Sequence, residues 1–301
     1  MAVLLFWGAF FETPRQVKEN QTSGNVQTNQ NLTQSDITPN INQEKIVKKI
    51  SRKDALTEVD RIIIENNKVT GSISLKGAIF DDLSFKNYKK DLKSEENVVF
   101  LNPKEIEDGY YIESGWASVG NEVEVPGIDS LWQVKGNRVL NEKNDVVLEW
   151  NNGKGLIFKK TINLDDKYLF KIKQEVKNNT STKVNLYPYS QITRNKKPDD
   201  VMGFYILHEG FIGVFDGELK EDDYDDIEDK KIVRNSDNGW LGITDKYWVT
   251  AIVPPKDKNF KSTFLYKDNF RANYILNSPV SVNPKSSSDN EVRLFVAAKE
   301  V

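Results

Sequence analysis

Hydrophobic and polar residues alternate along most of the chain after residue 60. In the segment 69–75 (VTGSISL), Val69, Ile73 and Leu75 share one face, and a threonine and two serines share the other. The segment 168–176 (YLFKIKQEV) alternates in the same way, with lysines and a glutamate between its apolar residues. A period of two residues is typical of antiparallel strands with one buried and one solvated face.

The same pattern recurs along the chain, and turn residues separate its segments. These segments are 61–65, 146–150, 155–162, 183–189, 210–215 and 292–298. No stretch after residue 60 carries a long apolar stripe with the helical period, although 51–58 (SRKDALTE) predicts a short helical turn before the sheets. Gly153 and Gly155, on either side of a lysine, predict a hairpin. The pattern predicts an all-β domain of two large antiparallel sheets packed face to face.

The most apolar part of this region is 239–255 (GWLGITDKYWVTAIVPP). It predicts two strands joined at Thr244 and Asp245. Both faces of the second strand are largely apolar, so we expect that strand to be covered on both sides. Pro254 and Pro255 lack the N–H group that would continue a ladder, so the strand should stop before them. A helix of this length with two charges is too short to cross a bilayer.

The amino terminus differs from the rest of the chain. Residues 1–11 carry no charge, which predicts the remnant of a first transmembrane helix; the alternative is a buried terminal strand or helix. Residues 12–50 are rich in Gln, Asn and Thr and predict a disordered linker. The folded domain is then expected to occupy 51–301. The residues expected to anchor the chain in the membrane are Leu4, Leu5, Phe6, Trp7, Phe10 and Phe11.

Composition excludes several kinds of chemistry. The 301 residues include no cysteine, which excludes disulfides, thiolate nucleophiles and zinc–cysteine sites, and a net charge of −3 gives no reason to expect nucleic acid as a partner. The sole histidine, His208, has no nucleophile elbow, metal-binding helix or phosphate loop beside it. We expect it in a strand or loop with a satisfied hydrogen bond. The sequence predicts a protein that is not an enzyme and needs no cofactor.

The acidic run 216–231 (DGELKEDDYDDIEDKK) is a possible calcium site. Calcium needs six to eight oxygen ligands arranged around a tight turn, and the glycine-centred loop that supplies them is missing. A solvated, charged loop is therefore the preferred interpretation, and no metal site is predicted. Tyr224 and Ile227 are expected to pin this loop to the sheet.

Several blocks of sequence resemble the periplasmic region of YidC-type membrane protein insertases of Gram-negative bacteria. They are GSISLKGAIFDDLSFKNYK (71–89), ESGWAS (113–118), VPGIDSLW (125–132), WNNGKGLIFKKTI (150–162), NLYPYSQITR (185–194), GFYILHEGFIGVFDG (203–217), YDDI (224–227) and GWLGITDKYWVTAIVP (239–254). The resemblance implies a β-supersandwich similar to galactose mutarotase, preceded by a membrane helix and a tether. It also implies five further membrane helices that carry the insertase activity, and this sequence reaches Val301 before any of them.

The resemblance implies a location at the bacterial inner membrane, with the domain facing the periplasm. The implied partners are the Sec translocon with its accessory subunits, nascent inner-membrane proteins, and the membrane itself through the first helix. Within such a protein we expect a monomeric, noncatalytic binding and scaffolding domain that assists insertion, folding and assembly.

The contact surface is predicted near 185–200, at Tyr187, Tyr189 and Arg194, because tyrosine and arginine are common interface anchors. The alternative is that both tyrosines pack inward and Arg194 is solvated. A second alternative, taken from the fold, is a carbohydrate-binding or mutarotase-like sandwich. His208 and Glu209 are adjacent, however, and neighbours on a strand point to opposite faces, so they would not converge on one sugar.

Overall fold

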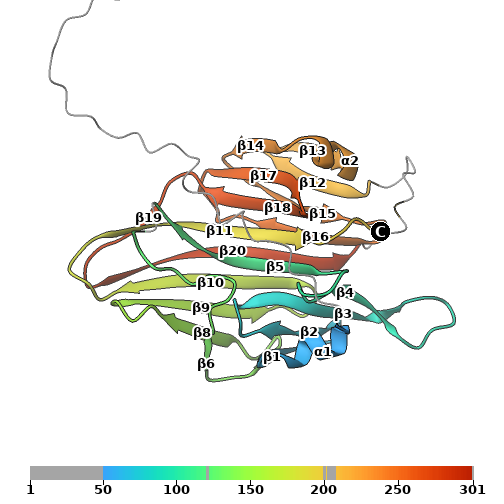
Figure 1. Ribbon diagram of the computed structural model, residues 1–301, viewed down its shortest axis with the longest axis horizontal. Coiled ribbons are helices and arrows are strands. Elements are labelled where there is room, and N and C mark those ends of the chain that lie inside the picture. The colour runs from blue at the N-terminus through green and yellow to red at the C-terminus, as the bar shows by residue number, and fades with distance from the viewer. Residues whose placement is uncertain (1–49, 120–121, 199–200, 202–207, 300–301) are drawn as a thin grey trace, which may run out of the picture. The chain divides into compact units, whose positions relative to one another are not determined.

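The computed structural model describes residues 50–119, 122–198, 201 and 208–299 (Figure 1). All of them fall in one compact unit of the chain. The expected membrane remnant at 1–11, with its six anchor side chains, lies outside the described residues, as does all of the expected linker except its last residue. Within the described ranges, no helix is long and apolar enough to cross a membrane.

Two sheets make up the domain, and their strands are the following. The first sheet contains β1 (Arg61–Glu65), β2 (Val69–Ser74), β3 (Ile79–Lys89), β4 (Asn97–Leu101), β5 (Tyr110–Ser118), β7 (Val139–Leu140), β11 (Val184–Arg194), β14 (Ile232–Ser236), β17 (Phe260–Lys267), β18 (Asn269–Leu276) and β19 (Val280–Val282). The second contains β6 (Gln133–Lys135), β8 (Val146–Asn151), β9 (Leu156–Leu164), β10 (Leu169–Asn178), β12 (Gly210–Phe215), β13 (Glu218–Asp223), β15 (Gly239–Thr244), β16 (Trp248–Val253) and β20 (Ser286–Ala298). The helices are α1 (Arg52–Thr57) and α2 (Tyr224–Asp229).

The strand order of the first sheet is β14-β17-β18-β11-β5-β3-β2-β1-β7, with β4 paired to β3 and β19 to β11. The order of the second is β13-β12-β15-β16-β20-β10-β9-β8-β6. Among the described strands, pairing is antiparallel except between β1 and β7. This arrangement confirms the prediction of an all-β, two-sheet antiparallel supersandwich.

The hydrophobic core lies between the two sheets, where alternation aims every second side chain inward. In β9, each residue from Leu156 to Leu164 at an even position is buried. Phe170 of β10 meets Phe80 of β3 edge to face across the gap, with ring centroids 5.3 Å apart. Burying a side chain of this size contributes about 1.5–3 kcal/mol to stability. Apolar burial between the layers therefore holds the sandwich together.

The short elements at the turns also follow the sequence. Ser51 caps α1 by accepting a hydrogen bond from the Asp54 amide at 3.1 Å, as an N-terminal serine commonly does. Gly153 and Gly155 have φ angles of 68° and 94° in the turn between β8 and β9, a region that favours glycine. The predicted helical turn and hairpin are both confirmed.

The apolar segment 239–255 forms β15 and β16, joined at the predicted turn, and β16 ends at Val253 before the two prolines. Thr250, Ala251 and Ile252 are buried, so the centre of β16 is covered on both faces. The expectation of burial fails at the start of the second predicted strand, because Tyr247 is 56% exposed and Trp248 is only partly buried. These two aromatic side chains lie at the end of the sandwich, not deep inside it.

The sequence predicted a loop for the acidic run, and this prediction is wrong. The run forms β13 and α2. β13 is an edge strand held by its ladder with β12, so most of its charged side chains remain in solvent. Tyr224 and Ile227 are buried and attach α2 to the domain, which confirms their expected role. Tyr224 packs edge to face against Phe270 of β18, with centroids 4.9 Å apart.

Candidate functional site

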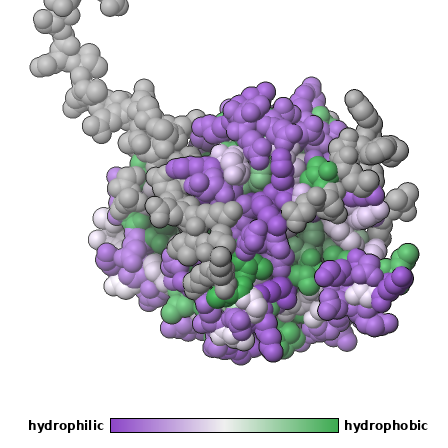
Figure 2. Space-filling model, turned by 45° about the vertical axis from the view of Figure 1, so that its right-hand side comes forward, coloured by the Kyte–Doolittle hydropathy of each residue, from purple (hydrophilic) through white to green (hydrophobic). Residues whose placement is uncertain are grey.

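A pocket of about 530 Å³ opens at the end of the sandwich where the β3–β4 hairpin meets the turn between β15 and β16. This end lies at the right of Figure 1, near the last described residues. Figure 2 brings that side forward and shows hydrophobic side chains interspersed among hydrophilic ones. The volume lies within the range of about 300–1,000 Å³ that small-ligand and peptide side-chain pockets occupy. We call this feature the end pocket.

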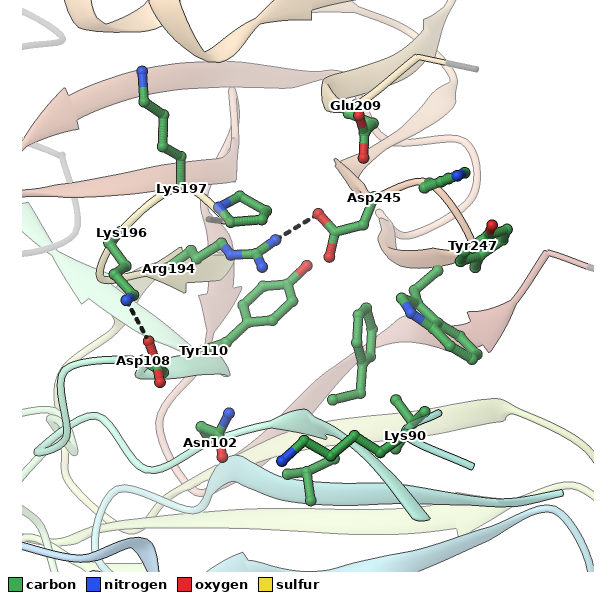
Figure 3. Close-up of a pocket in the computed structure, with 16 residues that line it drawn as sticks. Lys90, Asn102, Asp108, Tyr110, Arg194, Lys196, Lys197, Glu209, Asp245 and Tyr247 are labelled. Atoms are coloured by element: carbon green, nitrogen blue, oxygen red, sulfur yellow. Dashed lines mark hydrogen bonds and ion pairs between the residues drawn. The ribbon is translucent and has the colours of Figure 1, made fainter. Parts of the chain in front are cut away.

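An ion pair between the two sheets forms the floor of the end pocket (Figure 3). Arg194, the last residue of β11, donates to Asp245 at 2.6 Å and to the Tyr224 hydroxyl at 3.2 Å. Its guanidinium also lies 4.7 Å from the centre of the Tyr110 ring. Burial disfavours the charged guanidinium, but the neighbouring Tyr224 and Asp245 outweigh it and raise the pKa of Arg194 above its usual value. Arg194 therefore stays charged, and its contacts hold it in place.

Aromatic side chains form one wall of the end pocket. Phe100 and Tyr110 pack edge to face, with centroids 5.3 Å apart, and Trp248 stands beside them. Trp248 stacks on Phe85 of β3 at 4.8 Å, so its indole is fixed from behind by the core. Burial raises the pKa of Tyr110, which therefore stays a neutral phenol. Phe100 and Tyr110 are buried, so the aromatic surface that this wall offers comes from the partly buried Trp248 and the exposed Tyr247 beside it.

Lysines surround the opening. Lys196 pairs with Asp108 at 2.9 Å, and Lys197 pairs with Asp225 at the same distance. Counted together, five cationic and three anionic side chains line the end pocket. The lining itself thus has more cationic than anionic groups, although Asp225, Glu228 and Glu107, which also pair with Lys197 and Lys196, lie outside it.

The structure does not bring the three predicted contact residues together. Arg194 lines the end pocket and is paired, so it is not solvated. Tyr187 and Tyr189 are half-buried on the opposite face of β11 from the core residues Leu186 and Ile192. They do not pack into the space between the sheets, and Tyr189 lies instead over Gly115 of the neighbouring strand. Neither alternative drawn from the sequence describes all three residues.

His208 donates from Nε2 to the Phe211 carbonyl at 2.8 Å, as expected for a satisfied histidine. Its other ring nitrogen lies 3.5 Å from a carboxylate oxygen of Asp223. Glu209, the adjacent residue, lines the end pocket, while His208 does not. Across the described ranges, no group of three or more His, Asp or Glu side chains could hold a metal ion.

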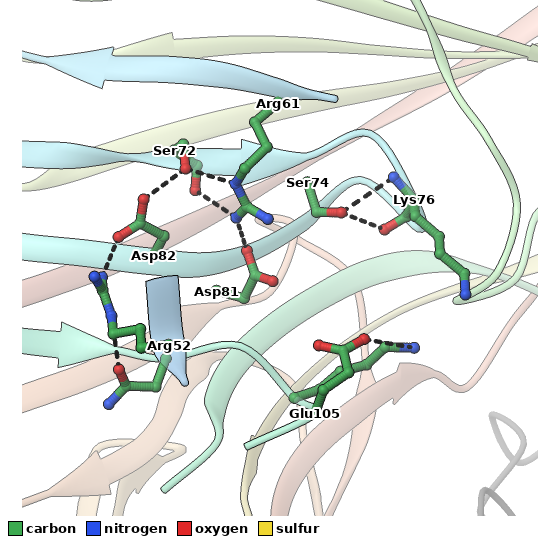
Figure 4. A network of polar contacts seen from close by, with 10 residues as sticks. Arg52, Arg61, Ser72, Ser74, Lys76, Asp81, Asp82 and Glu105 are labelled. Carbon is green, nitrogen blue, oxygen red and sulfur yellow. Dashed lines mark hydrogen bonds and ion pairs between the residues drawn. The ribbon is translucent and has the colours of Figure 1, made fainter. Parts of the chain in front are cut away.

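A second polar cluster lies where α1 meets β1, β2 and β3, and we call it the closed cluster (Figure 4). Arg61 pairs with Asp81 and donates to the Ser72 hydroxyl at 2.6 Å. Ser72 donates to Asp82 at 2.5 Å, and Asp82 pairs with Arg52 of α1. Burial raises the pKa of Asp81 to about 6, although Arg61 favours its charged form.

A third buried cation, Lys160 of β9, lies between the sheets. Its ammonium donates to the Ser114 carbonyl at 2.6 Å and lies 4.7 Å from the centre of the Trp132 ring. Burial lowers its pKa to about 7, and the negative charge of Glu113 only partly offsets this effect. A buried lysine of this kind is often functional, but Lys160 does not line the end pocket, and its contacts with Ser114 and Trp132 lie in the core.

Sequence reasoning missed the end pocket. Its walls come from 98–102, 108–110, 194–198 and 245–248, which no local pattern connects. The sequence did carry one signal that the predicted contact residues do not share a surface. Tyr189 and Arg194 are five positions apart on one strand, and an odd separation places side chains on opposite faces.

Comparison with known sequences gives one consistent result. Residues 61–301 match a family model described as the YidC periplasmic domain. Over its whole length the chain is 44% identical to a protein named membrane protein insertase YidC from Pelagibacter ubique, and it spans 53% of that relative. A relative of the same name from Methylorubrum extorquens is 38% identical over 84% of this chain and 43% of its own length. The chain thus spans about half the length of these curated relatives.

Solved structures resemble the fold at low sequence identity. A galactose mutarotase related enzyme from Lactobacillus acidophilus aligns with a TM-score of 0.55 and 11% identity, covering 79% of this chain and 97% of that one. A putative aldose 1-epimerase from Escherichia coli K12 aligns with a TM-score of 0.50 and 8% identity, covering 80% of this chain and 99% of that one. These likenesses confirm the predicted galactose-mutarotase-like sandwich and concern the fold alone.

Proposed function

Because this chain belongs to the YidC periplasmic domain family, we propose that it is the noncatalytic binding domain of an inner-membrane protein insertase, facing the periplasm. The end pocket is the observation that carries this proposal. It is open and amphipathic, and its strongest charges are already engaged in the Arg194–Asp245 and Lys196–Asp108 pairs. Such a surface suits recognition of another molecule better than proton transfer, which needs a group poised to gain or lose a proton.

The side chains at the pocket floor support a binding role. Arg194 stays charged and Tyr110 stays neutral, so neither exchanges a proton near neutral pH. His208, the side chain whose usual pKa is closest to neutral, is bonded to a backbone carbonyl and lies outside the pocket lining. In this proposal the domain positions partners while other parts of the insertase transfer the substrate.

The partners we propose are the Sec translocon with its accessory subunits and nascent inner-membrane proteins. Tyr187 and Tyr189 stay candidates for a contact on the outer face of β11, whereas Arg194 belongs to the end pocket. We further propose that residues 1–11 anchor the chain in the membrane, through the six apolar side chains from Leu4 to Phe11 named above, and that 12–50 form a tether. The folded domain is proposed to be a monomer.

A domain-exchange experiment tests this function. The periplasmic domain of the Pelagibacter ubique insertase is either deleted or replaced by residues 51–301 of this chain, which include α1 and its Arg52. We expect deletion to reduce copurification of the translocon about tenfold, a loss of about 1.4 kcal/mol of association free energy, and the exchange to restore it. Insertion of a single-span substrate into reconstituted vesicles should change much less. Complete loss of that insertion on deletion would contradict the passive role.

The carbohydrate-binding alternative makes a different prediction. If the sandwich bound sugars as its fold neighbours suggest by name, titration calorimetry with common monosaccharides would give saturable heat. We expect no such heat, because His208 and Glu209 do not converge on the end pocket. Saturable binding that is lost when Trp248 is replaced by alanine would support the alternative.

A further inference from the structure

β4 leaves one of its edges open beside the end pocket. Among the described strands it pairs only with β3, as the second strand of a hairpin. Val98, Val99 and Phe100 of β4 line the pocket, so the unpaired side of this strand borders the cavity. An open edge presents a row of N–H and C=O groups that can pair with another extended chain.

We propose that the end pocket binds an extended, acidic peptide segment, which adds to the open edge of β4 as a further strand. The inference rests on the proposed function and names the kind of segment that the domain binds. β4 has five residues, Asn97–Leu101, so the ladder would engage about five residues of the peptide, or about 17 Å of extended chain.

The charges around the end pocket indicate an acidic occupant. Figure 3 shows Lys196 and Lys197 on one side of the Arg194–Asp245 pair and Lys90 on the side nearest β4. Five cationic and three anionic side chains line the end pocket. Lys197 and Lys196 also pair with Asp225 and Glu107 outside the lining, but these two carboxylates are 83% and 77% exposed, so the pairs are weak and a carboxylate of the peptide can replace them. A basic segment could not make this exchange.

The aromatic wall indicates which side chains of the peptide face the pocket. Successive side chains of an added strand point alternately toward and away from the surface beneath. Those that point inward would meet Val98, Tyr247 and Trp248, which are partly or largely exposed, so apolar or aromatic groups of the peptide would bury surface there. The expected segment therefore alternates apolar and acidic residues, with the acidic groups reaching toward the lysines.

An anionic membrane surface is the competing occupant, and it would use a different feature. The tip of the β3–β4 hairpin carries Leu92, which is fully exposed, between Lys90 and Lys93. A flat lipid surface would touch this convex tip, whereas a concave pocket with a strand edge inside it suits a narrow chain. The geometry favours the peptide.

A binding titration on the 301-residue chain tests the inference. The probe is a fluorescein-labelled peptide of about ten residues, alternating glutamate and valine around a central phenylalanine, followed by fluorescence anisotropy. A second peptide carries the same side chains with N-methyl groups on alternate backbone nitrogens, which prevents a full ladder, and a third carries lysine instead of glutamate. We expect the first peptide to bind, and both others to bind at least about tenfold more weakly.

Two matched variants place the binding at β4. Val99→Glu puts a negative charge in the pocket, and Val139→Glu puts the same charge on β7, outside the pocket; the two valines are 41% and 38% exposed. We expect Val99→Glu to weaken binding of the acidic peptide about tenfold and Val139→Glu to leave it unchanged, with circular dichroism confirming that both variants fold. The N-methylated peptide tests the ladder on unaltered protein.

Three outcomes would overturn the inference: no binding of the acidic peptide, equal binding of its N-methylated form, or equal effects of the two variants. Binding of the chain to phosphatidylglycerol vesicles, lost on Leu92→Asp and without any peptide binding, would assign this end to a lipid surface instead. These titrations use the chain alone. Their failure contradicts the peptide inference and leaves the copurification test of the proposed function unaffected.

Discussion

The end pocket and the closed cluster are both built from arginine–aspartate pairs, but of these pairs only Arg194–Asp245 lines the end pocket. In the closed cluster, Arg61 and Asp81 have partners on β1, β2 and β3, and their side chains are 13% and 6% exposed. In the end pocket, Arg194 and Asp245 are buried to a similar degree, yet aromatic and lysine side chains beside them enclose about 530 Å³.

The difference separates a structural role from a binding role. A buried pair that is fully surrounded holds the fold, because loss of either partner leaves an uncompensated charge. A pair at the floor of an open pocket orients the wall of that pocket and sets its charge. One residue connects the two regions, since Asn102 accepts from Arg52 at 2.9 Å and also lines the pocket.

The largest loss of stability is expected when the arginine–aspartate pair of the closed cluster is removed. Arg61→Met leaves Asp81 buried without its cation, so we expect the free energy of unfolding to fall by about 3–5 kcal/mol. Urea denaturation measures this loss. As a control, Arg138→Met removes an exposed pair with Asp60 and should cost at most about 1 kcal/mol. Equal losses in the two variants would contradict the structural role of the closed cluster.

Replacing Lys160 tests whether burial of a cation without a paired carboxylate lowers the free energy of unfolding. Its folded pKa of about 7 lies below the usual value of 10.5, so the unfolded chain binds more protons between these values and stability rises with pH there. Lys160→Met should therefore raise the free energy of unfolding by about 1–4 kcal/mol at pH 6 and abolish that rise. A variant that is less stable at pH 6 would show that the bond to the Ser114 carbonyl outweighs desolvation.

Removing the cation at the pocket floor should cost less than breaking the closed cluster. In Arg194→Met, water entering the pocket can solvate Asp245, so we expect a loss of about 1–3 kcal/mol in the free energy of unfolding. Urea denaturation under the conditions used for Arg61→Met gives the direct comparison. A loss as large as that of Arg61→Met would mean that the Arg194 pair is structural in the same sense.

The smallest expected effect on stability concerns the pocket rim. Tyr247 is 56% exposed, so Tyr247→Ser should change the free energy of unfolding by less than about 0.5 kcal/mol. The same variant should weaken binding of the acidic peptide several-fold, because an aromatic side chain at the opening is lost. Tyr266→Ser, at 43% exposure outside the pocket, is the matched control. Weakened binding in both variants would point to a nonspecific effect.

The sequence predicts the layers of this fold well because their strands bury one face. β9 and β10 alternate cleanly, and each places its apolar residues in the core. The same pattern could not predict β13, because both of its faces are largely solvated. It pairs with β12 without any alternation of apolar and polar side chains. The six-residue α2 is too short for a helical stripe and shows only through Tyr224 and Ile227.

The candidate site could not be predicted because it depends on which strand ends meet. Phe100, Arg194 and Trp248 come from three strands, and their approach follows from pairing across both sheets. Trp248 begins an apolar strand, so the pattern assigns it to the core; its position beside the pocket follows from where β16 starts. The pairing of Arg194 with Asp245 likewise joins a strand of the first sheet to the turn between β15 and β16 of the second.

Hydrogen–deuterium exchange on the 301-residue chain, with and without the acidic peptide, tests the central claim most directly because it reads the backbone of β4. The account predicts slower exchange of amides in 97–101 when the peptide is bound, with the amides of 61–65 around the closed cluster unchanged. Binding that leaves 97–101 unprotected, or that protects both regions equally, would contradict it.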